Sequence, residues 1–309
     1  MPLSRYFTQD GFGRRITFYV GQEASGSASL PLALFILGSG AYSNLLVRDG
    51  KVLFAHRDFH EVLRGRARLL FVEKVGVSFG AQVARTGTAM GSTEEFRQEH
   101  TFGRWLEALS ASLRAARTLT GIDLRRTLVV GHSEGALMAA AVAARNDFVT
   151  DVACLAGGGP TQLFDFVAEA RIGRLLSEGP TPVAQMQALR RRWSDIRQHA
   201  ADPNRMWLGH PYTYWSSFMA GAMFGELERG RSRVFVAQGS LDGIHPQYAV
   251  DLVEATLMAE GRDVTALVVD GANHDFQFKD QTKNGRDGWR EILQTVVSWF
   301  FAPPMHQVP

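Results

Sequence analysis

The segment around Gly131 and Gly135 constrains the fold more than any other part of the sequence. The apolar run 127–130 is typical of a buried strand, and the alanine-rich stretch 136–144 is typical of a closely packed helix. Between them lies the pentapeptide Gly-His-Ser-Glu-Gly, with Ser133 at its centre. Its two glycines permit a tight turn and leave room for neighbouring backbone. The sequence therefore predicts a strand, a sharp turn and a helix, with the Ser133 hydroxyl exposed at the top of a sheet.

Short apolar runs alternate with longer helical patterns along the chain, which indicates a mostly parallel central sheet flanked by crossover helices. The expected strands are residues 15–20, 31–37, 67–72, 127–130, 151–155, 233–237 and 265–269. These runs lack alternation, as in strands buried on both faces. A helix is expected after the third strand, with Ser92 and Glu95 as a capping box. Further helices are expected over about 247–260 and 289–300.

About seventy residues between Gly159 and Arg233 interrupt this alternation and greatly exceed a usual connection. Their apolar residues follow helical spacing, as in Val183, Met186 and Leu189. We therefore expect a helical cap over residues 160–232, inserted between the two parts of one core domain, 1–159 and 233–309. The alternative is a helical decoration remote from any site.

Composition and charge exclude several classes of function. The formal net charge of +2 gives no basis for binding nucleic acid or an anionic membrane. The longest apolar run, 30–37, is too short to cross a bilayer, and the first residues lack the pattern of a signal peptide. The single cysteine, Cys154, lies in an expected buried strand and has no partner for an intramolecular disulfide. We expect a cytoplasmic protein with no nucleic-acid or membrane partner.

A serine hydroxyl becomes a good nucleophile only when a base accepts its proton. His274 is the best placed of the nine histidines, in the loop just after the last expected strand. Asp242 follows the preceding strand and would hold the imidazole in the required tautomer. The chain order serine, aspartate, histidine matches the order expected when the serine occupies such a turn. The sequence thus predicts a catalytic triad of Ser133, Asp242 and His274.

Other histidines and aspartates compete for these roles. His132 adjoins the serine, but a sharp turn should direct its side chain away. His245 would line the site if it pointed inward, although an exposed position in a surface loop is the expectation. Asp270 and Asp275 flank the predicted base, where turn and capping roles are common.

Acyl transfer also needs N–H donors for the developing oxyanion. One is the N–H of Glu134, which follows the predicted nucleophile. The other should come from the loop after an early strand, where Gly38 and Gly40 let the backbone approach a substrate. Ser39 or Gly40 is the candidate, and the alternative for each is a purely turn-forming role. The Glu134 carboxylate would either bind a cationic substrate group or, as we favour, accept hydrogen bonds from the cap.

Together these features resemble the α/β-hydrolase superfamily from about residue 15 to residue 300. More narrowly, the chain is similar to bacterial serine esterase-like and peptidase-like members with a Gly-Ser-Gly loop, an Arg-Asp-Gly segment and a fourth strand ending Asp-Lys-Arg-Gly-x-Gly. The corresponding residues are Gly38-Ser39-Gly40, Arg48-Asp49-Gly50 and Glu73-Lys74-Val75-Gly76-Val77-Ser78. The last segment departs from the pattern, with Val for Arg and Ser for Gly. The resemblance implies an α/β-hydrolase fold and hydrolysis of esters, thioesters or amides, with no metal and no organic cofactor.

The leading hypothesis is a carboxylic-ester hydrolase that acts on a small-molecule ester or acyl substrate. A peptidase, an amide hydrolase and an acyltransferase are alternatives that would use the same triad. Trp215 and Phe218 are predicted to contact the substrate, because aromatic residues of the cap would roof an apolar pocket. The alternative is that they form the cap's own core. A non-catalytic binding protein that reuses the fold would usually lose a triad member, and none is missing here.

Overall fold

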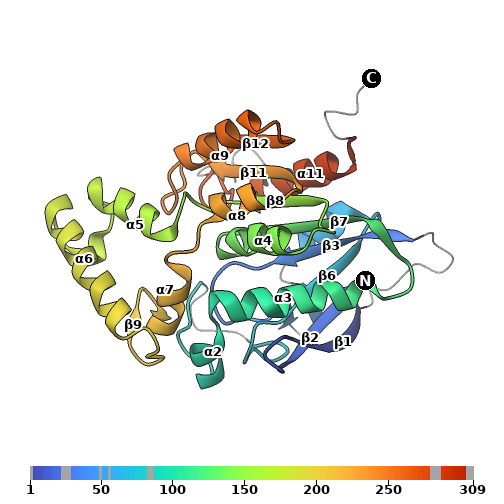
Figure 1. Ribbon diagram of the computed structural model, residues 1–309, viewed down its shortest axis with the longest axis horizontal. Coiled ribbons are helices and arrows are strands. Elements are labelled where there is room, and N and C mark those ends of the chain that lie inside the picture. Colours follow the sequence, from blue (N-terminus) through green and yellow to red (C-terminus); the bar gives the residue numbers. More distant parts are fainter. Residues whose placement is uncertain are drawn as a thin grey trace.

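The computed structural model describes residues 3–21, 29–48, 51–54, 57–81, 87–278 and 287–303. Figure 1 shows a central sheet with helices on both faces and a group of helices that projects from one side. The predicted Arg-Asp-Gly segment lies partly outside the described residues, since Asp49 and Gly50 are not among them.

Within these residues the sheet has eight strands. Their spatial order is β1 (Leu3–Gln9), β2 (Arg15–Gly21), β6 (Arg68–Val72), β3 (Leu30–Ile36), β7 (Ile122–His132), β8 (Asp151–Leu155), β11 (Arg233–Gly239) and β12 (Val264–Val269). The pairs β1–β2 and β2–β6 are antiparallel, and every pair from β6 to β12 is parallel. The prediction of a mostly parallel sheet is confirmed. Because parallel strands end at one edge, the loops after β3, β7, β11 and β12 meet there.

Most of the core forms two apolar layers, one on each face of the sheet. In β3, Leu32 and Leu34 belong to one layer, and Ala33 and Phe35 belong to the other. The first layer is covered by α3 (Phe102–Arg117), α4 (Glu134–Arg145) and α9 (Tyr248–Ala259). The second is covered by α1 (Arg57–Leu63) and α11 (Gly288–Phe301). None of the described helices is long and apolar enough to cross a membrane.

The helix expected after β6 is two helices, α2 (Glu94–Glu99) and α3. The capping box predicted at Ser92 and Glu95 is wrong, because the N-cap of α2 is Thr93. The Thr93 hydroxyl accepts a hydrogen bond from the N–H of Phe96 at 3.1 Å and donates one to the Gly76 carbonyl at 3.0 Å. The second bond attaches the start of α2 to the loop after β6, so a tertiary contact selects the cap.

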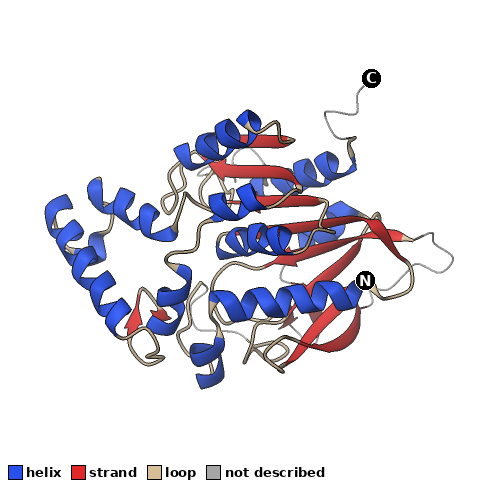
Figure 2. Ribbon diagram, viewed as in Figure 1, coloured by secondary structure: helices blue, strands red, loops and turns tan. Residues whose placement is uncertain are grey.

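The segment 160–232 contributes no strand to the eight-stranded sheet. It contains α5 (Gln162–Arg171), the 3-10 turn η1 (Leu176–Glu178), α6 (Pro182–Gln198), α7 (Tyr212–Phe218) and α8 (Met223–Arg229). Figure 2 shows these helices with a short strand pair, β9 (Met206–Trp207) and β10 (His210–Pro211). The remaining hairpin, β4 (Leu45–Arg48) with β5 (Lys51–Phe54), lies outside both sheets. In Figure 1, α5 and α6 project beyond the core, whereas α8 packs against α4.

Candidate active site

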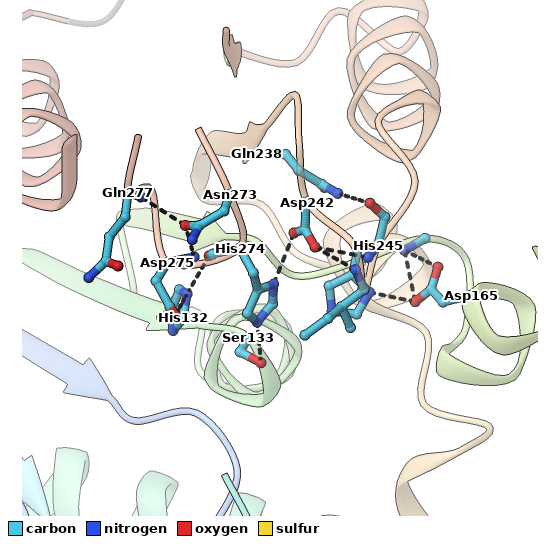
Figure 3. Close-up of polar contacts among 12 residues, drawn as sticks. His132, Ser133, Asp165, Gln238, Asp242, His245, Asn273, His274, Asp275 and Gln277 are labelled. Carbon is cyan, nitrogen blue, oxygen red and sulfur yellow. Dashed lines mark hydrogen bonds and ion pairs between the residues drawn. The ribbon is translucent and has the colours of Figure 1, made fainter. Parts of the chain in front are cut away.

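Ser133 occupies the turn between β7 and α4. Its backbone has φ 58° and ψ −124°, a conformation that a non-glycine residue rarely adopts. A Cβ on Gly131 would collide with the backbone of Gly135, and a Cβ on Gly135 would collide with the Ile36 carbonyl. Both positions therefore require glycine, which lets α4 start directly against β3. The turn presents Ser133 to the loops that follow β11 and β12 (Figure 3).

The structure brings the three predicted triad residues together (Figure 3). Nε2 of His274 lies 3.0 Å from the Ser133 hydroxyl oxygen, and Nδ1 of His274 lies 2.9 Å from Oδ2 of Asp242. An ionised carboxylate can only accept hydrogen bonds, so Nδ1 of His274 is the protonated nitrogen and Nε2 is free to accept the serine proton. This is the arrangement that activates a serine hydroxyl.

Asp242 is held as a carboxylate by its surroundings. Its other oxygen, Oδ1, accepts hydrogen bonds from the N–H of Ile244 at 2.7 Å and of His245 at 3.2 Å. Burial alone would raise the pKa of Asp242, but the hydrogen bond and charge of His274 and the charge of His245 outweigh it and lower that pKa below its usual value. Asp242 is therefore ionised near pH 7 and can accept the hydrogen bond from Nδ1–H of His274.

The competing residues take supporting positions. The Nε2–H of His132 donates to the backbone carbonyl of His274 at 3.0 Å. Burial and the neighbouring charge of His274 lower the pKa of His132 to about 4, so its ring is neutral near pH 7. Asp270 accepts a hydrogen bond from the Ser240 hydroxyl, and the Asp275 carboxylate lies 3.8 Å from His132. These contacts fix the loops around His274.

His245 is buried, so the expectation of an exposed loop position is wrong. Its Nδ1 lies 2.8 Å from Oδ2 of Asp165, a buried residue of α5 (Figure 3). Asp165 is fixed in turn by the N–H of Gly159, which donates to its Oδ1 at 3.1 Å. Helix α5, which covers His245, comes from the segment 160–232. This is a tertiary contact, and the local sequence around His245 does not encode it.

A pocket of about 260 Å³ lies beside Ser133. Trp215 and Phe218, the two predicted substrate contacts, both line it and are almost wholly buried. Other aromatic side chains in its wall are Phe166 and Tyr214, also from the segment 160–232. The pocket is thus largely apolar, with Ser133 at one edge. In the described part of the chain, no group of three or more His, Cys, Asp or Glu residues is arranged to hold a metal ion.

The predicted oxyanion donors lie on two sides of Ser133. An added Cβ on Gly38 would lie 3.3 Å from the Ser133 Cβ, so this loop packs directly against the turn. Ser39 lines the pocket, whereas Gly40, with φ 107°, packs against Gly87 and Thr88. The backbone N–H groups of Ser39 and Glu134 have no hydrogen-bond partner among the described residues. Both are therefore available to a substrate oxygen.

The side chain of Glu134 is buried beside two cationic or polar groups. Its Oε1 lies 3.2 Å from Nζ of Lys74 and 3.2 Å from Nε2 of His100. Burial would raise the pKa of Glu134, but these neighbours lower it far below its usual range. The Glu134 carboxylate therefore has a structural role here. Lys74 and His100 lie outside the segment 160–232, whereas Tyr214, whose hydroxyl also donates to Glu134, belongs to that segment, as expected. Sequence reasoning missed His100, and it noted Lys74 only as part of the family-like segment 73–78.

No family model and no curated protein matches the sequence. Solved structures do match. Acylaminoacyl peptidase from Pyrococcus horikoshii aligns with a TM-score of 0.63 at 10% identity, covering 97% of this chain and 41% of that one. Est1E from Butyrivibrio proteoclasticus aligns with a TM-score of 0.56 at 15% identity, covering 97% of this chain and 99% of that one. A puromycin-hydrolyzing peptidase from Mycobacterium tuberculosis aligns with a TM-score of 0.61 at 14% identity, covering 96% and 39%.

This chain has the α/β-hydrolase fold. It spans about two fifths of the length of the two peptidases and almost the whole of Est1E.

Proposed function

We propose that this protein is a serine hydrolase that cleaves a carboxylic ester or thioester through an acyl-enzyme on Ser133. The observation that carries the proposal is the continuous hydrogen-bond chain from Asp242 through His274 to Ser133, beside a largely apolar pocket. The fold supports it, because the serine lies at the sharp turn between a strand and a helix where this fold accommodates a nucleophile.

In the first half-reaction, Oγ of Ser133 attacks the carbonyl carbon of the substrate while Nε2 of His274 takes the hydroxyl proton. Asp242 stabilises the resulting imidazolium through the Nδ1–H bond. The negative charge that develops on the carbonyl oxygen faces the N–H groups of Glu134 and Ser39. The carbon–oxygen or carbon–sulfur bond to the leaving group then breaks, and His274 returns the proton to that group.

In the second half-reaction, a water molecule attacks the acyl-enzyme. His274 takes a proton from this water, the tetrahedral intermediate forms again, and the bond to Ser133 breaks. His274 then gives its proton back to the serine oxygen, so the acid leaves and the enzyme is regenerated.

The pocket supports a substrate with a small apolar or aromatic group. Aromatic side chains from the segment 160–232 form its wall, which suits a role of that segment as a cap over the site. One structure of Est1E has ferulic acid bound, at 17% identity to this chain. Esters of aromatic acids therefore belong in the substrate panel beside straight-chain esters.

Amide or peptide hydrolysis is the second candidate, and the structural similarity to two peptidases favours it. The same triad would form the same acyl-enzyme from an amide, with His274 donating its proton to a leaving amine. Transfer of the acyl group to an alcohol or amine in place of water is a third outcome of the same intermediate. Aminoacyl anilides and product analysis with an added nucleophile distinguish these reactions from ester hydrolysis.

The test is hydrolysis of p-nitrophenyl esters, from acetate to decanoate, by the wild type and Ser133→Ala. We expect the variant to lose activity on the order of a millionfold, as when a triad serine is removed. A fluorophosphonate should label Ser133 in the folded wild type and leave Ser133→Ala unlabelled, as read by peptide mass spectrometry. A folded wild type that no fluorophosphonate labels, and that cleaves neither esters nor anilides, would contradict the proposal.

A further inference from the structure

Lys74 carries a charge deep inside the protein, just after the end of β6. Its side chain exposes only 1% of its surface. Burial lowers the pKa of Lys74 below its usual value, and the charge and hydrogen bond of Glu134 offset only part of that shift. A buried ammonium is costly unless it is paired and fully hydrogen-bonded. The Lys74 ammonium must therefore be surrounded by hydrogen-bond acceptors.

Three acceptors surround the Lys74 ammonium, one for each of its N–H groups. Nζ lies 2.6 Å from the carbonyl oxygen of Gly38, 3.1 Å from that of Gly40 and 3.2 Å from Oε1 of Glu134. The first two acceptors belong to the loop that carries Ser39. The third belongs to the residue directly after Ser133. A single ammonium thus contacts the segments on both sides of the serine.

The contact with Gly38 sets the direction of the Ser39 N–H. In a trans peptide unit the carbonyl and the following N–H point in opposite directions. The Gly38 carbonyl points to Lys74, so the N–H of Ser39 points away from the ammonium. Ser39 lines the pocket on that side, and Gly38 packs against Ser133. The positive charge of Lys74 also polarises this peptide unit and strengthens its N–H as a donor.

The contact of Lys74 with the Gly40 carbonyl likewise sets the direction of the Ala41 N–H. The N–H of Ala41 belongs to the same peptide unit as the Gly40 carbonyl, and it donates to the Thr88 carbonyl at 3.2 Å. The N–H of Ala41 is therefore occupied, whereas the N–H groups of Ser39 and Gly40 have no hydrogen-bond partner in the described part of the chain. The sequence offered Ser39 or Gly40 for the second oxyanion donor. Ser39 is favoured, because Lys74 holds the carbonyl of the Gly38–Ser39 peptide unit and because Ser39, unlike Gly40, lines the pocket.

We propose that Lys74 is the positioning residue of the oxyanion hole, holding the Gly38–Gly40 loop and Glu134 so that the N–H groups of Ser39 and Glu134 converge on one substrate oxygen. This inference rests on the proposed serine hydrolase function. Lys74 does not touch the substrate; it acts through the two backbone segments that do. Its effect should therefore appear in the transition state, where the oxygen carries negative charge, and much less in the binding of the neutral substrate.

The test compares Lys74→Met and Lys74→Gln with the wild type, using His100→Phe as the matched control. His100 shares the Glu134 oxygen with Lys74 and is equally buried, but it forms no hydrogen bond with the described Gly38–Gly40 loop. Three quantities are measured with p-nitrophenyl esters: kcat, KM, and the inhibition constant of a trifluoromethyl ketone, whose adduct with Ser133 places an oxyanion in the hole. Near-UV circular dichroism and thermal melting report folding.

We expect Lys74→Met to lower kcat by about 10²–10³-fold, the usual cost of removing one oxyanion donor, with KM changed less than about threefold. The trifluoromethyl ketone should bind more weakly by a similar factor. Lys74→Gln, which keeps donors but no charge, should fall between Lys74→Met and the wild type. His100→Phe should keep kcat within about tenfold of the wild type, because the loop contacts remain.

The inference is overturned if folded Lys74→Met keeps kcat within threefold, or if its losses appear in KM with the inhibitor affinity unchanged. It is also overturned if neither Lys74 variant folds while His100→Phe does, because Lys74 would then be required for folding alone. A wild type that reacts with esters while these outcomes occur leaves the proposed function intact. A wild type that reacts with neither esters nor fluorophosphonate instead refutes the proposed function itself.

Discussion

Asp165 and His245 are joined by a 2.8 Å hydrogen bond between Oδ2 and Nδ1, and this bond connects helix α5 to the loop of Asp242. The N–H of His245 donates to Oδ1 of Asp242, so His245 links α5 directly to the predicted triad. The segment 160–232 is thus attached to the site by a buried polar contact as well as by its aromatic residues.

Replacing Asp165 by Asn should weaken this connection. The hydrogen bond to a charged acceptor becomes a neutral one, so we expect the free energy of unfolding to fall by about 1–3 kcal/mol. The loop of Asp242 loses a support, so kcat/KM for esters should fall roughly tenfold, equivalent to about 1.4 kcal/mol. Urea unfolding and ester kinetics measure the two effects. Asp251→Asn, on the exposed side of α9, is the control and should change neither. An Asp165→Asn enzyme with wild-type kcat/KM would show that the contact does not support the site.

Gly135→Ala should disrupt the turn at Ser133. The added methyl group would meet the carbonyls of Ile36 and Leu37, which are backbone atoms of β3 and the residue after it and cannot move aside. We expect a loss of roughly 3 kcal/mol or more in the free energy of unfolding, at the upper end of the usual cost of overpacking. Gly103→Ala in the first turn of α3 is the matched control, because nothing lies within 4 Å of the new methyl group. It should raise stability by about 0.5–1 kcal/mol. Equal stabilities of the two variants would contradict the packing argument.

Phe166→Ala should alter which acyl groups are accepted. Phe166 lines the pocket and packs against Trp215 with ring centroids 5.6 Å apart. Its removal enlarges the pocket, so we expect the best substrate in the p-nitrophenyl ester series to shift to a longer acyl chain. Phe164→Ala, two residues earlier on the same helix, is the control, since Phe164 is exposed and its ring faces Tyr248. An unchanged chain-length profile in Phe166→Ala would place the acyl group elsewhere.

Stability should fall as the pH drops from about 6.5 to about 4. Burial lowers the pKa of His210 from its ordinary value of 6.5 to about 4, despite the opposing charge of Glu134. Between these two values the unfolded chain binds a proton at His210 that the folded chain does not, so acid favours unfolding there, by up to about 1.4 kcal/mol per pH unit. His210→Phe keeps the stacking against Tyr214 and should show a shallower slope in urea unfolding between pH 4 and 6.5. A slope equal to that of the wild type would mean that His210 titrates normally.

The positions of Ser133, Asp242 and His274 were predictable because the sheet is parallel. Once the strands were assigned, each residue fell in a loop at the same edge, and their proximity followed from topology alone. Gly131 and Gly135 also predicted the sharp turn that exposes Ser133 at this edge. The second donor loop was predictable for a similar reason, since it follows the neighbouring strand β3.

The contacts that depend on tertiary packing were not predictable. Lys74 meets Glu134 across sixty positions of sequence, and a lone lysine after a strand carries no sign of burial. His245 was expected in an exposed position because it lies in a loop, whereas α5 covers it from a distant segment. Strand β1 was missed because its residues are half-buried or exposed, so its pattern differs from that of the interior strands.

The backbone conformation of Ser133 affects which residue selection would favour at this position. A residue with φ 58° and ψ −124° is held in a conformation that costs on the order of 1–3 kcal/mol, and glycine adopts it with little penalty. Selection for folding alone would therefore replace Ser133 by glycine. A serine at this turn marks a position where catalysis and folding favour different residues, and descendants that had lost their substrate would be expected to change there.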